Sequence, residues 1–242
     1  MSEPGKRDMP ETSTEVWTLS EQVDGRLRPV SYELLAWGKH IAGKLPEAPL
    51  CSVVLGSKVA RSDIQELILR GADKVYLAEA PALEHFLVEP HAAVLERMLR
   101  DRRPNIMIAG ATSVGRTLMP YLAVRLTTGL TADCTGLDID RETGNLIQTR
   151  PAIGGNVLAT IITARHRPQM ATVRPHSMKP PVRAAGRHGE VIEIEPPEEL
   201  LASRVERLGF RALERDEGNI ADAEKVVSGG RGLKRADNFV LV

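Results

Sequence analysis

The clearest chemical pattern in the sequence lies in residues 226–234, where a short apolar run is followed by three glycines around one arginine. Its members are Ser228, Gly229, Gly230, Arg231 and Gly232. Glycine has no Cβ, so backbone N–H groups in such a segment can come close to an anion, and arginine adds a permanently charged planar group. The pattern predicts a site for a phosphate or an electron-rich ring. An exposed turn with a solvated arginine is the alternative interpretation.

A second candidate site is the loop of residues 110–116, which follows an apolar run and precedes a helical pattern. Ligands of α/β folds bind at this place, outside the carboxyl end of a strand and at the start of a helix. Thr112, Ser113 and Arg116 are suitable donors for a phosphate. The loop is neither a complete G-x-G-x-x-G motif nor a P-loop, because no Lys-Ser/Thr pair follows Gly115. A structural turn is therefore preferred, with an adenine-nucleotide site as the alternative.

Residues that would act in acid–base, nucleophilic or metal chemistry form no convincing group. His85 and His91 are six positions apart, which does not place them on one helical face, and His40 and His91 are expected on helix surfaces. Cys134 lies beside Asp133, but a single cysteine in a strand is far more often a packing residue than a nucleophile. The sequence thus predicts no catalytic residue and no metal ligand.

Composition narrows the class of protein further. The 242 residues carry 32 basic and 32 acidic side chains, and only 3% of them are aromatic. A net charge of zero and few aromatic rings argue against nucleic-acid binding. No apolar run approaches the length of a membrane span, and residues 1–15 contain no signal-peptide core and predict a disordered extension. The sequence therefore predicts a cytoplasmic protein without an integral membrane segment.

Apolar runs alternate with helical patterns through the first half of the chain, which predicts a parallel sheet covered by helices on both faces. Ser31 is expected to cap the first helix, and Pro120 is expected near the first turn of the fourth. The predicted strands are residues 16–19, 51–56, 74–78 and 105–110, and the predicted helices are residues 31–45, 62–70, 90–100 and 115–126.

After residue 130 the pattern changes to β-branched runs separated by turn residues, which predicts extra strands that are partly antiparallel. Residues 154–156, Gly-Gly-Asn, predict a tight turn or a close approach by another backbone. Arg150 and Arg174 each end a strand beside a proline, and each is expected at an interface with a ligand or another subunit, or in a surface ion pair. Residues 179–197 are rich in proline and charge and predict a linker or extended arm.

Several of these segments together resemble the alpha subunit of electron transfer flavoprotein. The resemblance extends over nearly all of the chain after the leading extension, in one consistent order. It is carried by residues 16–22 (VWTLSEQ), 129–133 (GLTAD), 148–152 (QTRPA), 154–156 (GGN), 167–175 (RPQMATVRP) and 228–232 (SGGRG).

The resemblance implies a Rossmann-like, adenine nucleotide alpha hydrolase-like domain that packs on a beta subunit. It implies an electron carrier rather than an enzyme, in which FAD takes electrons from an acyl-CoA or other dehydrogenase and passes them to a quinone reductase or another acceptor. It also implies that Arg231, with Ser228, Gly229 and Gly230, contacts the FAD. The resemblance also allows AMP or a second FAD in the partner subunit, without deciding between them or requiring either.

Members of that family continue for about a hundred residues beyond the Ser-Gly-Gly-Arg-Gly motif, with further segments that enclose the flavin. The expectation is therefore a truncated chain or a natural short paralogue that does not hold FAD tightly by itself. The predicted organisation is an extension (residues 1–15), an α/β domain (16–220, of which 180–220 are an arm or linker) and the start of an FAD-binding domain (221–242). An adenine-nucleotide-binding α/β protein and a flavin-free structural paralogue are the alternatives.

Overall fold

The computed structural model describes residues 12–152, 157–209, 220, 223 and 225–242. The chain divides into two compact units, Met1–Val205 and Glu206–Val242, which are considered separately below.

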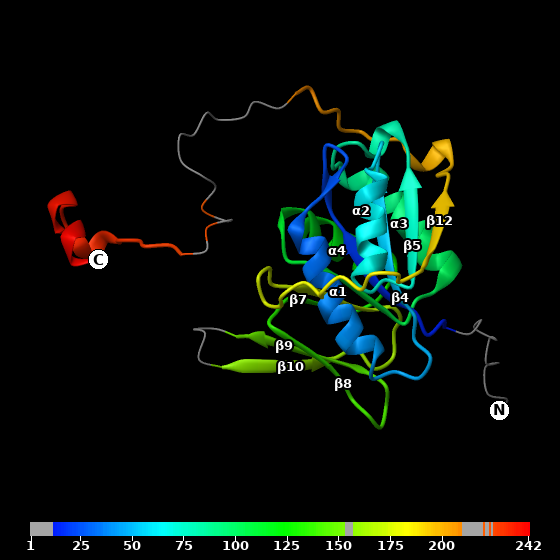
Figure 1. The fold of residues 1–242 in the computed structure, drawn as a ribbon, viewed down its shortest axis with the longest axis horizontal. Coiled ribbons are helices and arrows are strands. Elements are labelled where there is room, and N and C mark those ends of the chain that lie inside the picture. The colour runs from blue at the N-terminus through cyan, green and yellow to red at the C-terminus, as the bar shows by residue number, and fades with distance from the viewer. Residues whose placement is uncertain (1–11, 153–156, 210–219, 221–222, 224) are drawn as a thin grey trace, which may run out of the picture. The chain divides into compact units, whose positions relative to one another are not determined.

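The first unit is built on a sheet of seven strands that all run parallel, as the sequence predicts (Figure 1). Five of the strands are apolar and lie between layers of helices, which is the usual setting of a parallel sheet. In spatial order the strands are β12 (Glu190–Ile194), β5 (Lys74–Glu79), β4 (Leu50–Gly56), β1 (Val16–Ser20), β6 (Ile106–Gly110), β11 (Gln169–Val173) and β7 (Leu130–Cys134).

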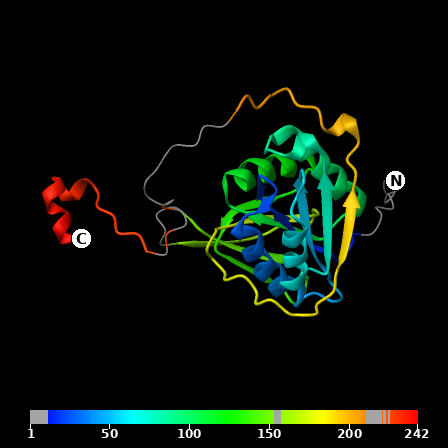
Figure 2. The same cartoon turned by 45° about the horizontal axis from the view of Figure 1, so that its top comes forward.

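Helices cover both faces of this sheet, which confirms the predicted α/β class (Figure 2). Helices α1 (Pro29–Ala42) and α2 (Arg61–Leu69) share one apolar core with the strand residues that face them. Helices α3 (Val88–Arg102) and α4 (Ser113–Arg125) share the other core, on the opposite face. Alternate residues of each strand enter the two cores, because successive side chains of a strand point to opposite faces.

A second sheet follows β7 and consists of β8 (Gly136–Ile139), β9 (Leu146–Pro151) and β10 (Leu158–Ile162) in antiparallel order. The turn between β8 and β9 is held by Asp140, whose carboxylate accepts hydrogen bonds from the backbone N–H groups of Glu142 and Thr143. The expected antiparallel strands after residue 130 are thus confirmed. The predicted turn at Gly154, Gly155 and Asn156 lies outside the described residues.

Strand β12 belongs to the segment for which the sequence predicts a linker or arm. It pairs with the edge strand β5, with Glu190 opposite Lys74 and Ile194 opposite Ala78. Ile192 and Ile194 pack against the core formed by α3 and α4. This short apolar alternation is hidden in the sequence among prolines and charges, and its strand form depends on the available edge of β5.

Three local expectations about the helices are wrong. Helix α1 begins at Pro29 and not at Ser31, because proline suits the first helical turn and Arg28 takes the cap position. Helix α4 begins at Ser113, so Pro120 lies in its interior rather than near its first turn. His91 is buried, with 6% of its surface exposed, and does not lie on a helix surface.

The other elements of the described residues are short. They are strands β2 (Gln22–Val23) and β3 (Arg26–Leu27), which form a small hairpin, and the 3₁₀ turns η1 (Pro81–Leu83), η2 (Glu198–Leu200), η4 (Arg231–Leu233) and η5 (Ala236–Leu241). Among the described residues, no helix has the length and apolar character needed to cross a membrane.

Part of the extension expected at residues 1–15 packs onto the first unit. The backbone N–H of Ser13 donates to the carbonyl of Arg103, and Glu15 is buried at the start of β1. The Glu15 carboxylate accepts hydrogen bonds from Trp17 Nε1 at 2.7 Å, Tyr76 Oη at 2.9 Å and Lys74 Nζ at 3.0 Å. These three donors lie on β1 and β5, so Glu15 joins strands that are not adjacent in the sheet.

Candidate functional site

The Ser-Gly-Gly-Arg-Gly motif lies in the second unit, in an exposed segment that leads into the 3₁₀ turn η4. Arg231 is the first residue of that turn, which the N–H of Leu233 closes by donating to the carbonyl of Gly230. A Cβ on Gly229 would lie 2.1 Å from Leu233 Cδ1 and 2.9 Å from Phe239 Cζ, so a larger residue there would displace these two side chains.

The surroundings of the other motif residues are open. A Cβ on Gly230 or Gly232 would meet no atom within 4 Å, and no described residue forms an ion pair with Arg231. Exposed backbone beside an unpaired guanidinium suits an anionic ligand that approaches from outside. The role of Ser228, Gly229, Gly230 and Arg231 in binding a cofactor stays a prediction.

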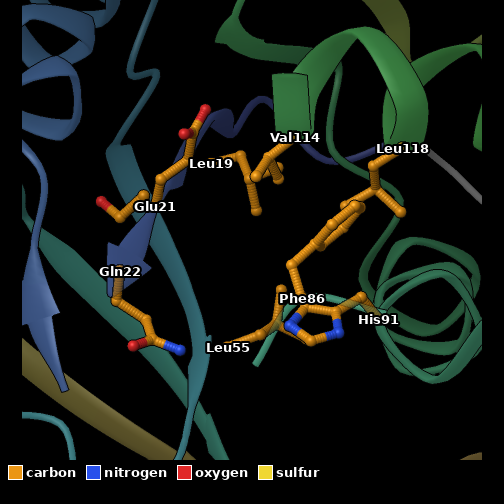
Figure 3. Close-up of a pocket in the computed structure, with 9 residues that line it drawn as sticks. Leu19, Glu21, Gln22, Leu55, Phe86, His91, Val114 and Leu118 are labelled. Atoms are coloured by element: carbon orange, nitrogen blue, oxygen red, sulfur yellow. The ribbon is translucent and has the colours of Figure 1, made fainter. Parts of the chain in front are cut away.

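The carboxyl edge of the parallel sheet carries a further candidate site that the sequence did not predict, a small cavity between the end of β1, the end of β4 and helices α3 and α4 (Figure 3). Its volume is about 30 Å³, which is room for one or two water molecules. It is lined by Leu19, Ser20, Glu21, Gln22, Leu55, Phe86, His91, Val114 and Leu118.

His91 gives this cavity its polar character on the α3 side. Its Nδ1 lies 2.9 Å from the carbonyl oxygen of Leu87, which favours the proton on Nδ1 and leaves Nε2 as an acceptor. Its ring also packs edge-on against Phe86 at 5.2 Å between centroids. Burial lowers the pKa of His91 to about 4, so the imidazole is neutral at physiological pH.

Glu21 borders the cavity at the end of β1, and its carboxylate lies at the start of α4. It accepts a hydrogen bond from Thr112 Oγ1 at 2.5 Å and lies 3.3 Å from Arg28 Nη1, and its side chain is only 2% exposed. Burial raises the pKa of this carboxyl group, although the Thr112 hydroxyl and the Arg28 guanidinium offset part of that effect. The site at the start of α4 is therefore acidic.

The residue types in the loop of residues 110–116 are largely explained by their roles in capping and packing helix α4. Thr112 caps α4 by accepting a hydrogen bond from the N–H of Gly115 at 3.1 Å. A Cβ on Gly115 would lie 1.8 Å from the carbonyl oxygen of Gly110, so only glycine allows this helix to pack so closely on the end of β6. Arg116 approaches Asp133 at 3.7 Å. These contacts fit the structural turn preferred from the sequence.

Asp133, at the end of β7, is shared by two arginines. Arg174 forms two hydrogen bonds with its carboxylate, at 2.7 and 3.1 Å, so this arginine is in a surface ion pair. The Arg174 hydrogen bonds lower the pKa of Asp133 more than burial raises it. Arg150 makes a longer contact, from Nε to the carbonyl of Pro151 at 3.4 Å. The group is positively charged overall and lies at the carboxyl edge of the sheet.

Cys134 adjoins this group but is fully buried, and burial raises the pKa of its thiol to about 12. A thiol of that pKa is almost entirely protonated at neutral pH and is a poor nucleophile. The structure is consistent with Cys134 as a packing residue of the core that includes α1.

The small antiparallel sheet presents an exposed, partly apolar face. Leu158 and Ile162 on β10 are 63% and 45% exposed, and they share this face with Ile147 of β9, which pairs with Ile162. Strand β10 is also an edge of its sheet, since β9 is its only neighbour among the described strands. Such an edge with apolar side chains is typical of a surface that another chain covers.

Sequence reasoning missed Glu21 as a residue of the carboxyl edge. The available signal was its position: it follows directly on the first strand, where ligands of such folds bind. The interaction between Glu21 and Thr112 was not accessible from the sequence, because 91 positions separate the two residues.

Comparison with known proteins agrees with this structure. Residues 16–199 match the family model described as Electron transfer flavoprotein domain. The chain is 44% identical over 227 residues to "Electron transfer flavoprotein subunit alpha" of Clostridium acetobutylicum, an alignment that covers 93% of this chain and 67% of that protein. It is 40% identical to "Protein FixB" of Clostridium saccharobutylicum, over 94% of this chain and 67% of the relative.

A third relative has a longer chain. It is "Lactate dehydrogenase (NAD(+),ferredoxin) subunit LctC" of Acetobacterium woodii, which is 36% identical over 88% of this chain and 50% of its own length.

Proposed function

Because the chain belongs to the electron transfer flavoprotein family, we propose that it works as an alpha-type subunit that pairs with a beta subunit and carries electrons through FAD. The proposed complex takes electrons from a dehydrogenase and delivers them to a quinone reductase or another acceptor. It is an electron carrier and not an enzyme. Its cytoplasmic location stays a prediction, as does AMP or a second FAD in the partner subunit.

The observation that carries this proposal is the 44% identity with a protein named as an alpha subunit, over 93% of the chain. The family match over residues 16–199 supports it independently of that relative. The words "subunit alpha" in the name of this relative support a partner that is a second, different subunit. The donor and acceptor follow only from the resemblance of the motifs.

The residues of the Ser-Gly-Gly-Arg-Gly motif fit a flavin cofactor. Gly230 and Gly232 leave open space where a Cβ would stand, so their backbone can approach a ligand closely. Arg231 offers donors that can pair with a pyrophosphate or with negative charge on a reduced flavin ring. When bound, FAD supplies the redox chemistry, and the protein supplies position and charge.

The exposed face of β9 and β10 is the proposed contact surface for the beta subunit. Leu158 and Ile162 lie on this face at an open sheet edge, and a partner strand or helix that covers them removes apolar area from water. The charged group of Asp133, Arg116 and Arg174 lies at the carboxyl edge of the other sheet. It offers a second, polar region for a partner.

Co-expression with a candidate beta subunit, followed by gel filtration and a visible absorption spectrum, tests the proposal. Flavin bands that co-elute with both chains support the electron carrier. A colourless but stable complex supports the flavin-free structural paralogue instead. A chain that binds no beta subunit contradicts the proposal as a whole.

We expect Arg231→Ala to reduce FAD retention by the complex about tenfold to a hundredfold, because hydrogen bonds to charged groups contribute about 1.5–3 kcal/mol. The flavin-to-protein ratio after gel filtration measures this loss, and the reduction potential of the retained flavin is expected to fall. Arg235→Ala, which removes another exposed arginine of the same unit, is the control and leaves both values unchanged. Equal flavin content in the two variants would exclude a cofactor role for Arg231.

We expect Leu158→Asp to weaken the complex with the beta subunit at least about tenfold, since a carboxylate in a buried apolar contact must be desolvated. Sedimentation velocity over a concentration series measures the change. Val182→Asp is the control, because Val182 is 91% exposed and belongs to neither β9 nor β10. If both variants bind the beta subunit equally, the contact surface lies elsewhere on the chain.

A further inference from the structure

The order of strands creates a switch point between β1 and β6. From β1 the chain moves to β4 and then to β5 on one side, and it returns to the other side of β1 to form β6. The segments that follow β1 and β6 therefore separate at their carboxyl ends. In open α/β sheets this crevice is where ligands bind.

The segment after β6 has the form of a phosphate-binding turn. It runs from Gly110 through the cap residue Thr112 to Gly115 in the first turn of α4, a helix of 13 residues. Free N–H groups at the start of such a helix attract anions. Such a turn binds a phosphate only where the space in front of its N–H groups is free.

The group that lies against this turn is the carboxylate of Glu21. A Cβ on Gly110 would stand 3.3 Å from Glu21 Oε1, so the absent side chain of Gly110 makes room for a carboxylate of the same chain. Thr112 Oγ1 donates to that oxygen at 2.5 Å. The same hydroxyl already accepts from the N–H of Gly115. The Thr112 hydroxyl, which would otherwise be a donor for a phosphate, is therefore bound to Glu21.

The backbone of Glu21 is fixed on both of its polar atoms. Its N–H donates to Ser31 Oγ at 2.9 Å, and its carbonyl accepts from the Ser31 hydroxyl and from the N–H of Arg28, at 3.1 and 2.8 Å. With the backbone fixed and the side chain 2% exposed, the carboxylate has little freedom to move out of the crevice. Its single cationic neighbour among the described residues is Arg28, at 3.3 Å.

The cavity at the crevice also contains a histidine nitrogen that has no hydrogen-bond partner among the described residues. His91 is 6% exposed and lines the same cavity as Glu21, from the opposite side (Figure 3). Its Nδ1 is engaged by Leu87, whereas its Nε2 has no hydrogen-bond partner among the described residues. The cavity therefore has an acceptor on its α3 side, while the Glu21 carboxylate borders it on the β1 side.

We propose that the Glu21 carboxylate occupies the position of a ligand phosphate at the switch point and so closes this crevice to nucleotides. A second anion placed there would face an unneutralised carboxylate in a region shielded from water, where repulsion between like charges is strong. The inference does not depend on the proposed electron transfer.

Removal of the carboxylate tests this inference. Isothermal titration of AMP, and separately of inorganic phosphate, into the isolated chain measures binding to the wild type, Glu21→Ala and Glu21→Gln. We expect Glu21→Ala to bind AMP and phosphate at least about tenfold more tightly than the wild type does, with competition between the two ligands. Glu33→Gln is the matched control, because Glu33 is also a buried carboxylate, 7% exposed, on helix α1.

Two results overturn the inference. One is AMP binding by the wild type as tight as by the Glu21 variants. The other is a folded Glu21→Ala variant, with a cooperative thermal transition, that binds neither AMP nor phosphate. If Glu21→Ala does not fold, Glu21→Ser decides the outcome, since its short side chain also vacates the position and removes the charge, whereas Glu21→Gln removes the charge alone.

Discussion

Glu15→Ala is expected to lower the free energy of unfolding by about 3 kcal/mol, because its removal leaves two buried hydrogen-bond donors and a partly buried ammonium group without their acceptor. The carboxylate accepts hydrogen bonds from Trp17, Lys74 and Tyr76, and its side chain is 10% exposed. Alanine would leave the indole N–H and the phenol hydroxyl without an acceptor. Urea unfolding followed by circular dichroism measures the change.

Asp101→Ala is the control for this experiment. Asp101 pairs with Arg97 one helical turn away at 2.7 Å, and both side chains are more than half exposed. Exposed pairs of this kind contribute about 0.3–0.5 kcal/mol. If Glu15→Ala costs no more than Asp101→Ala, the Glu15 network does not stabilise the fold.

The same network gives stability a pH dependence with a defined sign. Burial raises the pKa of Glu15, but the hydrogen bonds from Trp17, Lys74 and Tyr76 lower it more, so the net pKa lies below its ordinary value of 4.5. The contribution is therefore complete above about pH 4.5 and is lost as the pH falls through the lowered pKa. We expect the difference in unfolding free energy between wild type and Glu15→Gln to shrink in that acidic range. A difference that grows on acidification would contradict this assignment.

Gly115→Ala is expected to destabilise the first unit by about 3 kcal/mol, or to prevent its folding, because the added Cβ overpacks a site that has no flexible neighbour. That atom would lie 1.8 Å from the carbonyl oxygen of Gly110 and 3.7 Å from Ala109 Cβ. The colliding atom belongs to the backbone of β6, so relief requires a shift of α4 away from the sheet. Thermal unfolding of the purified variant measures the effect.

Gly136→Ala is the matched control within the same unit. Its Cβ would meet Thr149 Cβ at 3.4 Å, an ordinary contact, and strand β8 accommodates alanine. We expect this variant to unfold within about 1 kcal/mol of the wild type. Equal stability of the two variants would mean that α4 does not depend on its close approach to β6.

The helices and strands could be predicted where the spacing of apolar residues within one segment is enough to define the element. The predicted runs 51–56, 74–78 and 105–110 are strands, and the predicted helices at 62–70 and 90–100 have the right type, with ends within two residues. Pro120 was misplaced because the capping residue Thr112, rather than the later Gly115, sets the start of α4. His91 was misplaced because helical spacing does not reveal that the ring of Phe86 packs against the imidazole.

The candidate sites also differ in how far the sequence could predict them. The Ser-Gly-Gly-Arg-Gly motif is a continuous segment, so its residues are visible in the sequence, and its chemistry stays a prediction about a ligand. The carboxyl edge is assembled from distant segments, and residues 21, 91, 112 and 133 have no spacing that relates them. Strand β12 shows the same limit, since Val191 and Ile192 become a strand only because β5 offers an unpaired edge.

The sequence alone determined that this chain is an α/β protein and, through its ordered motifs, to which family it belongs, because periodicity and motifs are properties of continuous segments. Tertiary structure alone decided what lies in the crevice at the switch point. The carboxylate of Glu21, the hydroxyl of Thr112 and the guanidinium of Arg28 meet there because β1 and β6 are neighbours in the sheet. The two strands pair although their residues are 90 positions apart in the sequence, as Val16 and Ile106 are. The spacing of residues within one segment cannot predict such a pairing.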